Sequence, residues 1–172
     1  MAGSKLPDGE LAFMYFPDNY RWSHGMLGAL STAPWGGAEI DEVNRVGLAL
    51  KDKVGDDKAW LAEWAKMGDK VAARGREEEN KGHKLTAAAY LMRASQYYQT
   101  GERFLQHGPD SAAIYKKSVK CFADAAKMIN RPRIESVEVP YGDKTLPALF
   151  VHAAPEVAGN KPAPAMVFFD GF

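Results

Sequence analysis

Apolar side chains recur at intervals of three and four residues between positions 38 and 129, which is the spacing of amphipathic α-helices. The pattern divides into four predicted helices separated by turn residues. The clearest stripes are those of the first two helices: Ile40, Val43, Val46, Leu50 and Val54, then Trp60, Trp64, Met67 and Val71. Asp56 is a favourable N-cap for the second helix, and Gly82 is typical of the position just beyond a helix end. The sequence therefore predicts a helical segment that begins near residue 38.

Two further helices are predicted between Thr86 and Pro132. Thr86 is a suitable N-cap for the third helix and Asp110 for the fourth, which Pro132 would end. Tyr90, Tyr97 and Tyr98 lie in the third helix, and two of them cannot share one face of it. We therefore expect at least one tyrosine of this helix to point to a pocket or to solvent.

The hydrophobic period changes from three or four to two near residue 131. Strands are predicted over 134–140 and 145–153, joined by a turn at Tyr141-Gly142-Asp143-Lys144. The continuous apolar run Ala165–Phe169 is typical of a strand buried on both faces, and we expect it beside the hairpin. A buried strand needs neighbours on both sides, and the hairpin supplies at most one. The sequence therefore looks like the beginning of a sheet rather than a finished fold.

Charge and composition narrow the classes of partner. Lysine plus arginine and aspartate plus glutamate each number 22, so the net charge is zero and a nucleic-acid partner is not expected. Cys121 is the single cysteine, which rules out an internal disulfide or a cysteine-based zinc cluster, and we expect it to be a buried helix residue. No apolar run approaches the ~20 residues of a membrane span, and Met1–Glu10 does not resemble a secretory signal. These features predict a soluble, cytoplasmic protein without a membrane partner.

Several segments occur in the order in which a family of hydrolases carries them. They are Asn19–Ser23, Gly36–Val43, the pair Trp60 and Trp64, Ala89–Tyr98, Phe122 and the hairpin Val137–Val151. From about residue 12 to residue 172 the chain resembles the N-terminal portion of cap-bearing α/β hydrolases similar to 2,6-dihydropseudooxynicotine hydrolase and to fungal polyketide-shortening hydrolases. The resemblance implies the α/β-hydrolase fold class, with a helical cap over 1–131 and the start of the hydrolase domain over 132–172. The hairpin would form the first two sheet strands, and Ala165–Phe169 the third.

The resemblance also implies a chemistry. The complete enzyme would use a serine to attack an ester or a β-diketone-like carbon–carbon bond of a small or polyketide-type substrate, through an acyl-enzyme and without a cofactor or metal. The nucleophile motif Gly-x-Ser-x-Gly is absent, so the nucleophile and its partners would belong to the remaining C-terminal half of the hydrolase domain. The loop Asp170-Gly171-Phe172 would supply an oxyanion-hole N–H from Gly171 or Phe172. Alternatively, Gly171 simply ends a strand. The resemblance to these hydrolases is also compatible with a homodimer.

The arm from Tyr20 to Trp35 is aromatic and contains glycine and proline, so we expect it to be irregular rather than part of the helical core. We predict that it lines the substrate pocket, with Tyr20, Trp22 and Trp35 as apolar walls. His24 would be the polar group that exchanges a proton near neutral pH. The alternative for His24 is a partly buried residue in a packed N-terminal arm.

A non-enzymatic reading is a tetratricopeptide-like interaction module, because paired helices rich in alanine, tyrosine and tryptophan also build such repeats. Two observations argue against it. The chain shows no second copy at a period near 34 residues, and the strands after Ile134 have no place in a helical array.

Overall fold

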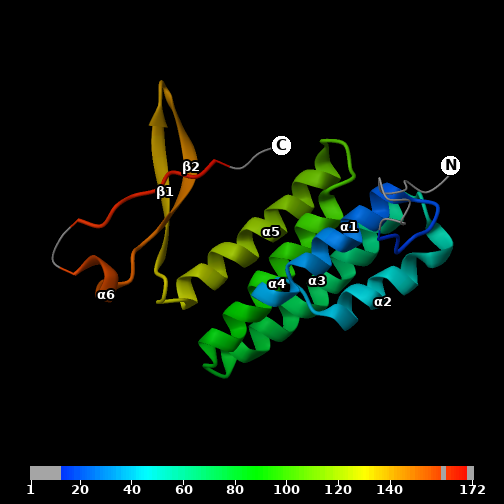
Figure 1. Cartoon of the computed structure of the whole chain (residues 1–172), viewed down its shortest axis with the longest axis horizontal. Helices are drawn as coiled ribbons and strands as arrows, with labels where there is room; N and C mark the ends of the chain where they lie inside the picture. The colour runs from blue at the N-terminus through cyan, green and yellow to red at the C-terminus, as the bar shows by residue number, and fades with distance from the viewer. Residues whose placement is uncertain (1–12, 160–161, 170–172) are drawn as a thin grey trace, which may run out of the picture. The chain divides into compact units, whose positions relative to one another are not determined.

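The computed structural model describes residues 13–159 and 162–169, in two compact units that divide between Met128 and Ile129 (Figure 1). The first unit is helical, and the second contains an antiparallel hairpin. The elements of the first unit are α1 (Tyr20–Ser31), η1 (Ala33–Trp35), α2 (Ile40–Leu50), η2 (Lys51–Lys53), α3 (Asp57–Asn80), α4 (Lys84–Glu102) and α5 (Pro109–Met128). The elements of the second unit are β1 (Ile134–Tyr141), β2 (Lys144–Val151) and α6 (Pro155–Ala158). The predicted change from helices to strands is confirmed.

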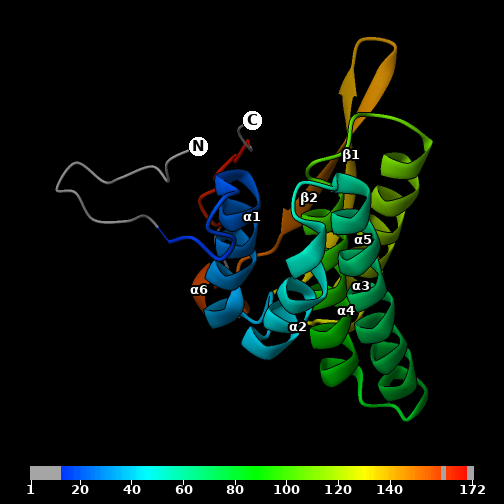
Figure 2. The same cartoon turned by 90° about the vertical axis from the view of Figure 1, so that its right-hand side faces the viewer.

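Within the helical unit, α4 packs against α3 on one side and α5 on the other, and the three long helices lie side by side (Figure 2). The shorter helices α1 and α2 pack on this layer. None of the described helices is both long and apolar enough to cross a lipid bilayer.

Local signals set the ends of α3 as the sequence predicts. The Asp56 side chain accepts hydrogen bonds from the backbone N–H groups of Lys58 (3.0 Å) and Ala59 (3.1 Å), so it caps the helix start. Beyond the helix end, Gly82 has a φ of 84°, a left-handed conformation that glycine adopts without a Cβ penalty. Its N–H binds the Glu79 carbonyl, and the N–H of the next residue binds the Glu78 carbonyl, both at 2.9 Å. This pair of bonds is the Schellman arrangement.

The predicted caps of the next two helices are wrong. The turn at Gly82 is so short that α4 already begins at Lys84, which places Thr86 inside its first turn. Helix α5 begins at Pro109, because the fixed φ of proline suits the first helical position, and Asp110 therefore lies within the helix.

The expectation of an irregular arm between Tyr20 and Trp35 is also wrong. Residues Tyr20–Ser31 form the regular helix α1, whose first turn is capped by Asn19 through its side-chain oxygen and the Trp22 N–H (2.9 Å). The glycines do not break this helix. A Cβ at Gly25 would lie 2.9 Å from the Trp60 ring, so this glycine allows α1 to approach α3 closely.

The centre of the helical unit is a column of large aromatic side chains. Ring centroids are 5.0 Å apart from Trp22 to Trp60, 5.6 Å from Trp60 to Trp64 and 5.5 Å from Trp64 to Tyr97, and all four side chains are fully buried. Tyr98 is buried too and Tyr90 is partly exposed, so the tyrosine of this helix that reaches solvent is Tyr90 and neither member of the adjacent pair. The physical reason is that α4 is the middle helix and has neighbours on two sides. The predicted buried position of Cys121, on α5, is confirmed.

The two buried tyrosines keep their hydroxyl groups satisfied. Burial, supported by the neighbouring Glu42 carboxylate, raises the pKa of Tyr97, which donates to Glu42 at 2.7 Å. Burial and a 2.7 Å bond to Asp69 likewise raise the pKa of Tyr98. Both phenols therefore stay protonated and act as donors that join α4 to its neighbours.

The hairpin has the predicted strands and turn. Its register runs from Ile134 opposite Val151 to Tyr141 opposite Lys144. Gly142 has a φ of 59° in the two-residue loop, the positive φ that tight hairpin turns require.

The predicted strand at Ala165–Phe169 is wrong for the described structure. These residues form no strand, and the side chains from Met166 to Phe169 are 76–90% exposed. A strand is stable only when its backbone N–H and C=O groups are paired. In the described part of the second unit, β1 and β2 pair with each other, and neither pairs with this run.

Replacing Gly101 with alanine should destabilise the helical unit. A Cβ at Gly101 would lie 2.9 Å from the Trp64 Cβ, an atom that cannot rotate away, so α3 and α4 would have to separate. We expect the free energy of unfolding in urea to fall by about 1–3 kcal/mol. The matched control is Gly28→Ala in α1, where the nearest atom to the new Cβ is 3.7 Å away and stability should hold or rise. Equal effects of the two substitutions would contradict this account.

Candidate functional site

A hollow of about 460 Å³ opens at one end of the helical unit. Two segments that are distant in sequence meet there: the start of α3, and the loop after α4 together with the start of α5 that follows it. Its lining consists of residues 55–58, 104–106 and 108–111. The segments come together because α4 packs between α3 and α5, which brings its C-terminal end beside the N-terminal ends of both neighbours.

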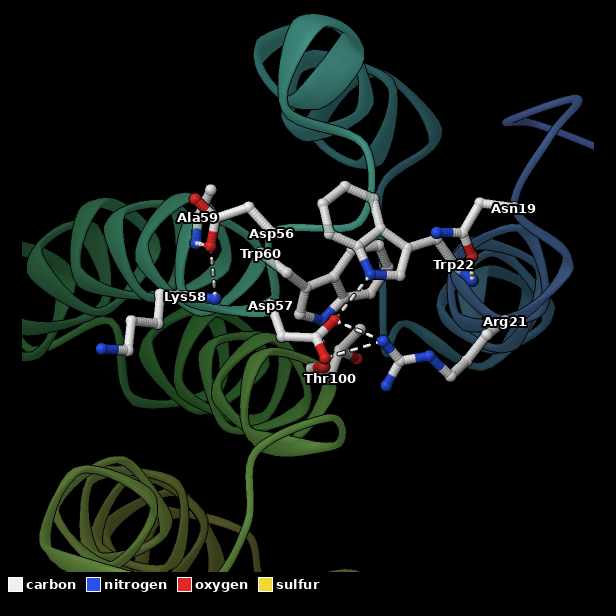
Figure 3. Close-up of polar contacts among 9 residues, drawn as sticks. All are labelled: Asn19, Arg21, Trp22, Asp56, Asp57, Lys58, Ala59, Trp60 and Thr100. Atoms are coloured by element: carbon white, nitrogen blue, oxygen red, sulfur yellow. Dashed lines mark hydrogen bonds and ion pairs between the residues drawn. The ribbon is translucent and has the colours of Figure 1, made fainter.

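Helix α1 is hydrogen-bonded to Asp57, which lines this hollow (Figure 3). Arg21 donates from Nη2 to both carboxylate oxygens of Asp57, each at 2.7 Å, and the Trp22 indole Nε1 donates to Oδ1 at 2.9 Å. The Arg21 guanidinium also lies 4.6 Å from the centre of the Phe104 ring, within reach of a cation–π attraction. A single carboxylate at the start of α3 therefore binds two consecutive side chains of α1.

The aromatic core lies directly behind this wall. Trp60 donates its indole N–H to the Thr100 carbonyl at 2.8 Å (Figure 3), and its ring centroid is 4.9 Å from that of Phe104. Because Trp60 is fully buried and hydrogen-bonded, it holds Phe104 in position. Phe104 therefore connects the wall of the hollow to the packed core.

The structure separates the four predicted substrate-binding residues into two groups. Tyr20 and His24 are exposed on one face of α1, with ring centroids 6.0 Å apart in a stacked arrangement. Trp35, in η1, is 87% exposed. Trp22 lies on the opposite side of α1, inside the aromatic column, and this corrects its interpretation as an exposed wall. The physical reason is helical periodicity, since positions 20 and 24 share a face that position 22 cannot.

His24 is not the partly buried residue of the alternative reading. It is exposed, and it makes no hydrogen bond to a described residue. The two predicted oxyanion-hole residues, Gly171 and Phe172, lie outside the described residues.

Three of the polar side chains that line the hollow are already engaged in holding the fold. Asp56 caps α3, Asp57 binds Arg21 and Trp22, and Ser111 donates to Glu102 at 2.6 Å. Among the described residues, no serine is hydrogen-bonded to a histidine, and no group of three His, Cys, Asp or Glu side chains is placed to hold a metal ion. These three side chains are therefore occupied, whereas Lys58, Gln106 and Asp110 of the same lining make no side-chain hydrogen bond or ion pair with a described residue.

Arg21, Asp57 and Phe104 were not identified from the sequence. Asp57 directly follows the predicted N-cap Asp56, and Arg21 lies within the segment Asn19–Ser23, so both residues belong to segments singled out from the sequence. The signal that was lacking is their pairing across 36 positions, which only the packing of α1 on α3 creates.

No family model matches the chain. Among characterised proteins, it is 29% identical over 135 residues to Hydrolase acrC of Aspergillus aculeatus, covering 77% of this chain and 31% of that protein. It is 30% identical over 161 residues to Hydrolase LUC6 of a Fusarium species, covering 91% of this chain and 38% of that protein. It is 24% identical over 139 residues to Alpha/beta hydrolase ucsC of an Acremonium species, covering 75% of this chain and 28% of that protein. The chain spans about a third of the length of the curated relatives it matches.

Replacing Arg21 with alanine should loosen α1 from the hollow. Arg21 is half exposed, so solvent screens its ion pair, and we expect the loss of pair and ring contact to lower the free energy of unfolding by about 1 kcal/mol. The control is Arg45→Ala, which breaks an exposed pair within α2 and should cost no more than about 0.5 kcal/mol. Urea titrations of both variants test this, and a smaller loss for Arg21→Ala than for the control would refute it.

Proposed function

We propose that this chain, which resembles the hydrolases named above over most of its length, forms the helical cap and the first sheet strands of an α/β hydrolase. The observation that carries the proposal is the extent of the match: 91% of this chain aligns with 38% of one hydrolase, so the similarity runs through both units. The resemblance expected from the sequence is confirmed by these relatives. Helices followed by a hairpin are compatible with a cap that precedes a sheet. A tetratricopeptide-like module is not favoured.

We assign the reaction to a serine in the remaining part of the hydrolase domain. It would attack an ester or a β-diketone-like carbon–carbon bond of a small or polyketide-type substrate and form an acyl-enzyme. An amide of Gly171 or Phe172 would stabilise the oxygen on which negative charge develops. In this proposal the helical unit contributes shape and water exclusion rather than the nucleophile.

Within the cap, we assign the substrate-facing surface to Tyr20, His24 and Trp35. Their exposure supports this role, because large aromatic groups in water gain most from covering an apolar ligand. Trp22 supports the surface from behind, since its indole is bonded to Asp57. His24 carries the imidazole of this set, and it would protonate the leaving carbon or oxygen.

A serine-directed probe tests whether the nucleophilic serine lies outside these 172 residues. The 172-residue chain should neither turn over p-nitrophenyl esters nor react with a fluorophosphonate, because it lacks the Gly-x-Ser-x-Gly nucleophile motif. The longer protein encoded by the whole gene should be labelled at one serine outside these residues, as mass spectrometry of its peptides would show. Labelling of a serine within this chain, or a longer protein that resists the probe, would overturn the proposal.

His24→Gln in the longer protein tests the proposed proton transfer. We expect kcat to fall by about 10²-fold or more, while the melting temperature stays unchanged because His24 makes no hydrogen bond to a described residue. The matched control is His83→Gln, an exposed histidine bonded to Glu78 at the other end of α3, which should keep full activity. Unchanged kinetics in His24→Gln would remove this residue from the mechanism.

A further inference from the structure

A shallow groove runs between α2 and α3, away from the hollow described above. It consists of two adjoining depressions of about 190 and 140 Å³, which share Arg45 and Lys70 in their walls. Its floor is apolar and closed, since Val46, Met67 and Val71 are each buried. An occupant of this groove would therefore meet chiefly the side chains of its walls, through their aliphatic carbons as well as their charged ends.

Three of those side chains form a row of positive charge on α3. Lys66, Lys70 and Arg74 are exposed, follow one another at intervals of four residues, and make no ion pair with any residue in the described ranges. The acids in the groove cannot compensate them, because each is already paired. The pairs are Asp41 with Arg45 at 2.7 Å, Glu42 with Arg93 at 2.9 Å and Glu63 with Lys53 at 2.9 Å.

This row of positive charges destabilises α3 when no partner is bound. Like charges four residues apart on a helix repel, and α3 contains two such pairs in succession. Elsewhere the same bundle sets cations against acids, as in the pair of Lys117 with Asp69 and that of Lys120 with Asp124. With 22 cations and 22 acids in the chain, the uncompensated row is a local feature and not a consequence of overall charge.

We propose that the α2–α3 groove is a docking surface for an acidic α-helix of a partner protein. Residues four apart on a helix advance by about 6 Å, so three cations mark out about 12 Å along the groove. A helix that carries acids at the same interval, laid along α3, meets all three, whereas a small carboxylate ligand meets one or two. The contact is held mainly by charge, because the apolar floor is already buried.

Other occupants match the groove less well. A membrane surface calls for apolar side chains that can insert, and those of the floor are covered. A nucleic acid is drawn by a broad basic field, which this neutral chain lacks. A second copy of this chain offers no helix with three acids at four-residue intervals.

The test uses a fluorescein-labelled, alanine-based helical peptide with three glutamates at four-residue intervals, titrated with the 172-residue chain by fluorescence anisotropy. We expect saturable binding that weakens at least tenfold between 20 and 200 mM salt, estimated from three ion contacts. The triple variant Lys66→Gln, Lys70→Gln, Arg74→Gln should lose at least about tenfold in affinity and, freed of the repulsion, be no less stable.

Two controls separate docking from general attraction. The variant Lys58→Gln, Lys84→Gln, Lys116→Gln removes the same charge from exposed positions outside the groove and should bind within about twofold of the parent. A peptide with the same composition but glutamates two residues apart should bind at least about tenfold more weakly. Equal binding of both peptides, equal losses in both triple variants, or tighter groove-dependent binding of an oligonucleotide would overturn the proposal. The inference is independent of the proposed hydrolase activity, which the fluorophosphonate probe reads separately.

Discussion

The contact on which the helical unit depends is the close approach of α3 and α4 around Trp64. This indole is fully buried against Tyr97, and on its other side it meets Trp60. Gly101 lies opposite the Trp64 Cβ, where any side chain would force the helices apart. Once the two helices are this close, Trp60 can reach the Thr100 carbonyl and Trp22 can close the column. The position of α1, and hence of the exposed face with Tyr20 and His24, follows from that packing.

The same packing explains why the first turn of α1 has an exposed, charged side chain next to a fully buried aromatic one. Two consecutive residues of α1, Arg21 and Trp22, bind the same carboxylate, one from solvent and one from the core. Asp57 is thus the point at which a buried aromatic column and a surface ion pair share an acceptor. The hollow beside it therefore has a wall in which Asp57 is held by two hydrogen-bonding partners.

Much of this fold could be predicted from the sequence because helices and strands each repeat with their own period. The apolar stripe of α3, its Asp56 cap and the turn at Gly142 all appeared where local rules placed them. Prediction failed where the outcome depends on distant partners. The glycine and proline content of the arm from Tyr20 to Trp35 predicts irregular structure, yet Gly25 lies within α1 and allows its close contact with Trp60. The run Ala165–Phe169 has the composition of a buried strand but finds no pairing partner among the described residues. For the candidate site, the sequence could not tell which residues of the segment from Tyr20 to Trp35 are buried, because that depends on how α1 packs on α3.

The distribution of tryptophans gives the helical unit an optical property of its own. Three of its four indoles are fully buried in one column with centroids 5.0 and 5.6 Å apart, and the fourth, Trp35, is 87% exposed. Closely spaced indoles couple electronically and contribute to the near-ultraviolet circular dichroism only while the column is intact. An exposed indole emits at longer wavelength and responds to whatever covers it. The protein therefore carries two separate spectroscopic reporters, one for the integrity of its core and one for events at its surface.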